Sequence, residues 1–257
     1  MKTMGEPVLE HPTDRSLASR LSGAPLDVVK LAAAALMLGD HINTALLGSS
    51  APLLWRFGRI AFPLFCFVLA CHLARGADAG RYARGLLLVG VATQPIFAAA
   101  FRVEFANVLF TLAAGAALAA ALLGRAGWRT HLALAIGTAV VFAWQARART
   151  GVDFGLAGML FPAALALVLA GAWRHAVWAA ALLFALNAWA NRAPDETWLG
   201  GASLDALFAG LGGLVVIGVA LLFRGGPRFL PRSALYLFYP GHLLALVALR
   251  AWGVGAG

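Results

Sequence analysis

The chain has 257 residues, of which 61% are hydrophobic and only 12% are charged, and its mean hydropathy is +0.82. Soluble domains carry about half apolar and about a quarter charged residues, so this composition excludes an ordinary soluble globular protein. The net charge of +9 would favour nucleic acid as the partner of a soluble protein, but here the charges lie in short connections between apolar runs. Membrane topology therefore explains the charge, and no nucleic-acid partner is predicted.

The first 25 residues differ from the rest of the chain. Residues 1–25 are polar and interrupted by prolines, and we expect them to form a cytoplasmic tail. The apolar stretch that follows runs into Asp40 and His41 instead of a small-residue cleavage site, which argues against a secretory signal. Residues 26–257 are predicted to form a single transmembrane domain.

Polar gaps interrupt the apolar sequence at intervals of about 20 residues, which is the length that a bilayer-spanning helix needs. The sequence therefore predicts an all-α integral membrane protein, a polytopic bundle of about nine transmembrane helices. The candidate helices are 26–47, 53–74, 84–101, 106–123, 130–146, 154–171, 175–191, 203–223 and 233–252. Lysines and arginines in the connections favour a cytoplasmic N-terminus, although Arg147 and Arg149 oppose this bias.

The first candidate helix carries the most ionisable residues. Each such residue costs at least about 2.5 kcal/mol at membrane depth, so it needs a partner or a function. Lys30 and His41 are eleven residues apart, which places them on nearly the same helix face about 16 Å apart. Lys30 either pairs with Asp27 near the interface or serves a site. His41 follows Asp40 directly, and because the two side chains point about 100° apart, a functional role is favoured for this pair.

The second candidate helix begins with two arginines. Arg56 can reach the headgroups and is interpreted as topological, whereas Arg59 lies deeper and is a candidate counter-ion for Asp40 or for negative charge that develops during a reaction. Cys66 and Cys71 are five residues apart and so lie on different faces of this helix. We interpret them as small buried residues, and the sequence predicts neither a disulfide nor a metal site.

Later helices add four polar candidates. Asn107 and Asp153 stand at predicted helix starts, where N-capping is the default interpretation. In the last helix Tyr239 and His242 share a face at i,i+3, and Pro240 between them removes a backbone hydrogen bond. An aromatic belt at the interface would explain the tyrosine but not a histidine about ten residues inside the helix.

Five segments occur in an order that resembles the TraX family. They are K-L-A-A-A-A-L-M-L-G-D-H-I from Lys30, F-G-R-I-A-F-P-L-F from Phe57, N-V-L-F-T-L from Asn107, V-D-F-G-L-A-G from Val152 and L-F-Y-P-G-H-L-L from Leu237. The resemblance spans roughly residues 26 to 250. It implies an enzyme of the bacterial inner membrane that N-acetylates the pilin subunit of a conjugative pilus. The spacing from Lys30 to His41 is also similar to the Arg/Lys-x10-His signature of the wider transmembrane acyltransferases.

The TraX resemblance implies seven site residues, and the Lys30–His41 spacing adds Lys30, with acetyl-CoA as the acyl donor. The expected catalytic residues are His41, Asp40, Arg59 and His242, and the expected cofactor-binding residues are Lys30, Tyr239, Asn107 and Asp153. We expect His41 to deprotonate the acceptor amine, and Asp40 or another carboxylate to fix the tautomer of His41 or His242. Arg59 or Tyr239 would stabilise the oxyanion, and Lys30 with cytoplasmic arginines would bind the phosphates of CoA.

The expected partners are the lipid bilayer, acetyl-CoA and a pilin or another envelope acceptor. Three alternatives stay open. O-acetylation of an envelope glycan would use the same donor and base, and a proton-coupled transporter would use the intramembrane histidines and charges as a relay. A scaffold for envelope assembly would not need intramembrane histidines.

Overall fold

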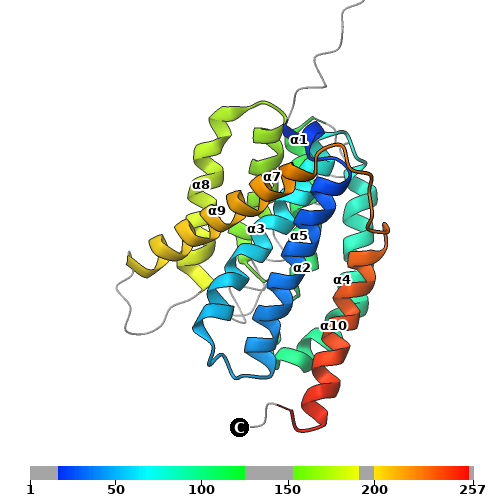
Figure 1. Cartoon of the computed structure of the whole chain (residues 1–257), viewed down its shortest axis with the longest axis vertical. Coiled ribbons are helices and arrows are strands. Elements are labelled where there is room, and N and C mark those ends of the chain that lie inside the picture. The colour runs from blue at the N-terminus through cyan, green and yellow to red at the C-terminus, as the bar shows by residue number, and fades with distance from the viewer. Residues whose placement is uncertain (1–16, 125–152, 191–199, 255–257) are drawn as a thin grey trace, which may run out of the picture.

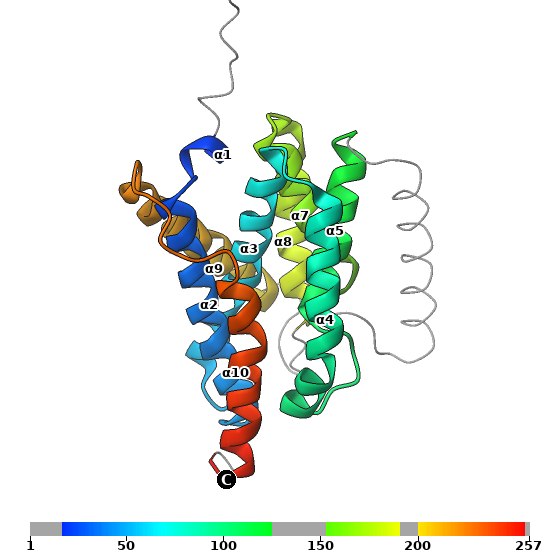
Figure 2. The same ribbon diagram turned by 90° about the vertical axis from the view of Figure 1, so that its right-hand side faces the viewer.

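The computed structural model describes residues 17–124, 153–190 and 200–254, and these form a bundle of helices without a strand among them (Figures 1 and 2). Two short 3-10 helices join the α-helices, η2 at Trp173–His175 and η3 at Leu221–Phe223. The α-helices are α1 (Leu17–Arg20), α2 (Ala24–Ala45), α3 (Pro52–Ala74), α4 (Ala79–Phe101), α5 (Val108–Leu122), α7 (Gly155–Leu169), α8 (Ala176–Ala190), α9 (Gly200–Ala220) and α10 (Ala234–Ala251).

Eight of the nine predicted helices correspond to observed ones, and the ninth, 130–146, lies outside the described residues. Most bounds agree within three residues. Helix α4 is the exception: it begins at Ala79, five residues before the predicted start, because the side chain of Asp78 accepts a hydrogen bond from the backbone N–H of Arg81. A side-chain acceptor at this position satisfies a donor that the first helical turn leaves unpaired.

Within the described residues, four helices are long and apolar enough to cross a membrane, namely Pro52–Ala74, Ala79–Phe101, Ser203–Phe223 and Ala234–Ala251. Helices α5 and α7 are apolar but have only 15 residues each. Helix α2 has 22 residues but carries several ionisable side chains. The helical fold is therefore confirmed and the apolar helices indicate a membrane protein, while a full span is shown by length and composition for four helices.

The last residues of the expected polar tail, from Leu17 onward, pack against the bundle. Leu21 is fully buried and Ala18 nearly so, against a cluster that includes Val29 of α2 and Leu64 of α3. The guanidinium of Arg75 donates a hydrogen bond of 3.2 Å to the carbonyl oxygen of Ala18. Burial of these apolar side chains holds the segment against the bundle; residues 1–16 lie outside the described residues.

Helix α3 lies in the middle of the bundle and packs against α2, α5, α7 and α9 (Figure 1). Both of its cysteines are buried free thiols, as the sequence predicted. Helix α10 packs against α2 and α4 (Figure 2). The segment that precedes α10 is bonded to the first turn of α2, so these two helices start near each other although they are about 200 residues apart in the chain.

A close approach of α5 and α7 gives a stability prediction. A Cβ atom at Gly115 would lie 3.0 Å from the carbonyl oxygen of Met159 and would overlap the ring of Pro162. Neither group can move away easily, and such overpacking typically costs about 1–3 kcal/mol. We expect Gly115→Ala to lower the midpoint of thermal unfolding in detergent.

The matched control for this prediction is Gly218→Ala in α9. A Cβ atom at Gly218 meets no described atom within 4 Å, and alanine is favoured over glycine in a helix by up to about 1 kcal/mol. Gly218→Ala should therefore leave the unfolding midpoint unchanged or raise it. Equal midpoints for the two variants would contradict the proposed close contact between α5 and α7.

Candidate active site

Two histidines from helices far apart in sequence form a hydrogen bond. His41 Nδ1 of α2 lies 2.8 Å from His242 Nε2 of α10, and the two rings stack with their centroids 5.0 Å apart. The second nitrogen of His242, Nδ1, lies 2.9 Å from the carbonyl oxygen of Phe238, one turn earlier in α10. The geometry thus joins a backbone carbonyl and two imidazoles in one line.

This line assigns a tautomer to each neutral ring. A carbonyl oxygen can only accept, so Nδ1 of His242 carries the proton and its Nε2 is an acceptor. Nδ1 of His41 must then donate to Nε2 of His242, and the lone pair of His41 remains on Nε2. A histidine whose Nδ1–H is held by an acceptor while Nε2 presents a lone pair has the arrangement that a general base requires.

Asp40 points away from this pair and toward α3. Its Oδ2 lies 3.7 Å from Nη2 of Arg59, and both side chains are largely buried. Gly58 makes the approach possible, because a Cβ atom there would overlap the carboxylate of Asp40. Arg59 is therefore the counter-ion predicted for Asp40. The expected tautomer-fixing role of Asp40 is wrong for this structure: among the described residues it bonds to neither histidine, and the carbonyl of Phe238 fixes the tautomer.

Asp153 does not cap α7, which corrects the default interpretation. The N-cap of α7 is Phe154, whose φ of 62° places it in the left-handed region, and no side chain caps this helix. The backbone of Asp153 is held by Ala106 and Thr111 at the start of α5. Its carboxylate interacts electrostatically with Arg59 and with Asp40. Asp40, Arg59 and Asp153 are thus electrostatically coupled, and we call these three residues the Asp40 cluster.

Asn107 is the N-cap of α5, as the default interpretation expected. Its Oδ1 accepts from the backbone N–H of Leu109 at 3.0 Å, and its Nδ2 donates to the carbonyl oxygen of Gly90 and to Oε1 of Gln94. These bonds occupy the amide, so the geometry favours a structural role over the implied cofactor contact. Gln94 also accepts from the backbone of Asn107 and donates to that of Phe105. The sequence analysis missed it, although it is a polar residue in the middle of an apolar helix.

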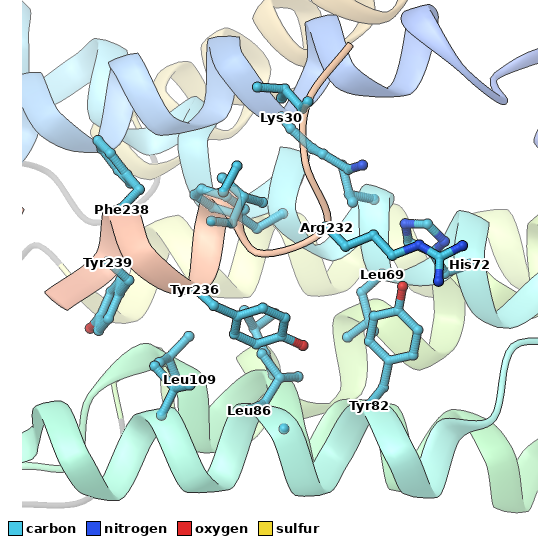
Figure 3. Close-up of a pocket in the computed structure, with 18 of the residues that line it drawn as sticks. Lys30, Leu69, His72, Tyr82, Leu86, Leu109, Arg232, Tyr236, Phe238 and Tyr239 are labelled. Atoms are coloured by element: carbon cyan, nitrogen blue, oxygen red, sulfur yellow. The ribbon is translucent and has the colours of Figure 1, made fainter. Parts of the chain in front are cut away.

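A cavity of about 790 Å³ lies between α2, α3, α4 and α10 (Figure 3). This volume falls in the range of ligand-binding pockets. In Figure 3 Lys30, His72, Tyr82 and Arg232 lie toward one end, while Phe238 and Tyr239 lie toward the other. We call the first end the mouth, which Arg81 and Arg228 also line, and the second the inner end. The cavity is therefore cationic at one end and aromatic at the other.

The inner end of the cavity lies next to the histidine pair and the Asp40 cluster. Met37, one turn before His41 in α2, lines the cavity, as does Tyr239. The ring of Tyr239 contacts that of His242 edge to face at a centroid distance of 5.5 Å, and its hydroxyl interacts electrostatically with Asp153. Tyr239 is buried, and its hydroxyl has no hydrogen-bond partner among the described residues. It therefore stands between the cavity, the histidine pair and the Asp40 cluster.

Lys30 pairs with Asp27, which was one of the two interpretations of the sequence, and it also lines the cavity. Its Nζ donates to Oδ1 of Asp27 at 2.8 Å, three residues earlier on the same helix. The mouth contains four residues that the sequence analysis did not single out as site residues, namely Arg81, Tyr82, Arg228 and Arg232. They lie in connections and helix ends, where arginine is also explained by membrane topology, so the sequence alone contained no signal that separated these roles.

The family model described as "TraX protein" matches residues 25–250. The chain belongs to the TraX family. A search of curated proteins and a search of solved structures each find no match. All five segments that carry the resemblance lie within the matched range. In this TraX protein they supply both histidines of the pair, all three residues of the Asp40 cluster, and Tyr239.

Proposed function

We propose that this TraX protein is a membrane-embedded acetyltransferase that moves an acetyl group from acetyl-CoA to the N-terminal amine of a pilin or a similar envelope substrate. One observation carries the proposal: a histidine pair contacts Tyr239, which lines the inner end of a cavity whose mouth is cationic, and the bonds within this pair leave the Nε2 lone pair of His41 unused. A base and a long anion-receiving cavity are what acyl transfer from a CoA thioester needs. Membership of the TraX family supports the same activity.

The cavity suits the shape and charge of the donor. The phosphates of acetyl-CoA would lie at the mouth, near Arg81, Arg228 and Arg232. A guanidinium group can bind one phosphate through two parallel N–H···O hydrogen bonds. The pantetheine arm would follow the apolar wall to Phe238 and Tyr239. Lys30 near the mouth and His41 near the inner end are about 16 Å apart along α2, which is comparable with the extended arm.

The reaction forms one bond and breaks another. The nitrogen of the acceptor attacks the carbonyl carbon of the thioester, and the carbon–sulfur bond breaks as the thiolate of CoA leaves. Nε2 of His41 accepts the proton that the amine loses, and His41 then donates this proton to the sulfur of the leaving thiolate. The products are therefore the acetylated amine and CoA. An α-amino group has an ordinary pKa near 8, so a histidine is a sufficient base.

The geometry favours Tyr239 over Arg59 as the group that stabilises the tetrahedral oxyanion. The hydroxyl of Tyr239 is buried and has no hydrogen-bond partner among the described residues, and its side chain lines the cavity. The guanidinium of Arg59, by contrast, is already near Asp40 and over the ring of Trp55. A donor already aimed at the position of the developing charge stabilises it without rearrangement.

We place this protein in the bacterial inner membrane, and the positive-inside rule supports a cytoplasmic N-terminus. In this orientation the mouth faces the cytoplasm, where acetyl-CoA is made. His41 lies near the opposite end of α2, toward the outer side. The acceptor would approach from that side, so that the acetyl group crosses much of the bilayer inside the cavity.

The proposal is tested by incubating the purified full chain in nanodiscs with labelled acetyl-CoA and candidate acceptors. We expect label to enter a pilin subunit and the mass of its N-terminal peptide to rise by one acetyl group. Transfer of label to a glycan hydroxyl and not to an amine would instead support the alternative function, O-acetylation of an envelope glycan. Accumulation of a solute in vesicles without consumption of acetyl-CoA would contradict the proposal in favour of transport.

A further inference from the structure

The first turn of α2 holds a segment from near the other end of the chain. Residues 224–233 connect η3 to α10, and we call this connection the strap. The backbone N–H of Ala24 donates to the carbonyl oxygen of Gly226 at 3.1 Å. The backbone N–H groups of Phe229 and Leu230 donate to Oδ2 of Asp27 at 3.0 and 2.9 Å. The strap is thus bonded to α2 at two points.

Asp27 is the centre of this attachment. Its side chain is only 1% exposed, and its other oxygen, Oδ1, accepts from Nζ of Lys30 at 2.8 Å. Nε of Arg228 lies 3.9 Å from Oδ2. A buried carboxylate is tolerated only when it is paired and hydrogen-bonded, and both oxygens of Asp27 are engaged in this way. Asp27 itself does not line the cavity, so its role is to hold other groups.

The strap presents its side chains to the mouth of the cavity. Arg228, Leu230, Pro231 and Arg232 all line it, opposite Arg81 of α4. Figure 3 shows Arg232 directed into the cavity beside His72 and Tyr82. Lys30 and Arg228 form ion pairs with Asp27, whereas no carboxylate among the described residues pairs with Arg81 or Arg232. The guanidinium groups of Arg81 and Arg232 can therefore bind an anionic ligand without first breaking an ion pair.

We propose that Asp27 is a positioning residue that holds the strap, and with it Arg228 and Arg232, in the shape that receives the phosphates of the acyl donor. The inference rests on the proposed function and deepens it, because it assigns recognition of the nucleotide end to the strap. The thioester end is handled separately by His41 and Tyr239. A defect in the strap should therefore weaken binding of a phosphate-bearing donor without changing the reaction of a donor that lacks phosphates.

Two variants disturb the strap without altering a cavity-lining side chain. Asp27→Asn has one oxygen, so it can either accept from the backbone donors of the strap and place its NH₂ group opposite Lys30, or face Lys30 with a neutral oxygen and place its NH₂ group opposite those donors. Gly23→Ala acts from the other side: Gly23 has a φ of 73°, and a Cβ atom there would lie 2.6 Å from the carbonyl oxygen of Gly226. Both changes should shift the strap away from α2.

The experiment compares two thioesters, acetyl-CoA and S-acetylpantetheine, which has the same reactive end but no phosphate. For Asp27→Asn and Gly23→Ala we expect KM for acetyl-CoA to rise at least about tenfold, with kcat little changed. Values of kcat/KM for S-acetylpantetheine should stay within about twofold of wild type. Calorimetric titration with CoA alone should show the same loss of affinity in the absence of an acceptor.

The matched controls are Gly76→Ala and Asp78→Asn, at the same end of the bundle. Gly76 has a φ of 89°, so alanine is strained there too, but its Cβ atom would meet no described atom within 4 Å. Asp78 caps α4, and asparagine caps equally well. Both controls should keep the wild-type KM for acetyl-CoA.

An equal loss with both thioesters, or no loss with either, would overturn the strap proposal. Failure of the proposed function has a different signature, because the wild type would then not acetylate any acceptor with either thioester. The titration with CoA separates the two cases, since it needs no turnover. Weaker CoA binding by Asp27→Asn than by wild type supports the strap, and equal binding overturns it.

Discussion

His41→Ala should lower kcat for acetyl transfer by about 10²- to 10⁴-fold, the usual contribution of a positioned general base. The physical reason is that Nε2 of His41 is the lone pair left free by the bonds to His242 and Phe238. The measurement is the rate of label transfer from acetyl-CoA by the purified variant. His175→Ala is the control, because His175 lies in η2, which packs against α7 and α8, whereas the cavity lies between α2, α3, α4 and α10. Full activity of His41→Ala would remove the base from the proposed mechanism.

Variants of His242 test whether this residue orients His41 or acts as a base itself. It was expected to be catalytic; under the proposed mechanism it instead positions His41, because its Nε2 accepts from Nδ1 of His41. His242→Ala should cost less than His41→Ala, about 10- to 100-fold, as for other partners that orient a functional histidine. The side-chain oxygen of glutamine can accept the same N–H, so His242→Gln should recover part of the rate. Equal rates for the two His242 variants would contradict the assigned tautomer.

Arg59→Met should lower the free energy of unfolding by about 3–5 kcal/mol, because it leaves the buried carboxylate of Asp40 without its counter-ion. The side chains of Arg59 and Asp40 are 13% and 18% exposed, so solvent screens this pair little. Adding Asp40→Asn should recover part of the loss, since the uncompensated charge is then removed. The measurement is a double-mutant cycle of thermal unfolding in detergent.

Arg56→Met is the matched control for this cycle, with the same substitution one turn earlier in α3. The side chain of Arg56 is 54% exposed, and its Nε lies 3.9 Å from Asp205. Only the arginine of this pair is exposed, because the side chain of Asp205 is 12% exposed. Solvent that reaches the guanidinium screens the pair, so we expect it to contribute about 1 kcal/mol or less and this variant to unfold close to the wild-type midpoint. If Arg59→Met were no more destabilising than Arg56→Met, the Asp40 cluster would not stabilise the fold.

Local features of the sequence determined the helices and the class of protein. The length and spacing of apolar runs predicted eight described helices, because a helix that faces lipid must satisfy its own backbone hydrogen bonds and needs only a long apolar segment. N-capping of α5 by Asn107 was also predictable from local sequence, because the donor and the acceptor are only two residues apart. Asp40 and His41 stood out because ionisable groups at membrane depth need partners.

The identity of those partners was decided by the tertiary structure. Asp153 was expected to cap α7, but the left-handed backbone of Phe154 starts that helix, and the carboxylate interacts with Arg59 instead. His41 is oriented by His242, and Asp27 holds the strap, each across about 200 residues of chain. Helical periodicity gives the face of one helix on which a side chain lies. The residue it meets depends on how the other helices pack, and hydrogen bonds formed there leave the lone pair of His41 on Nε2.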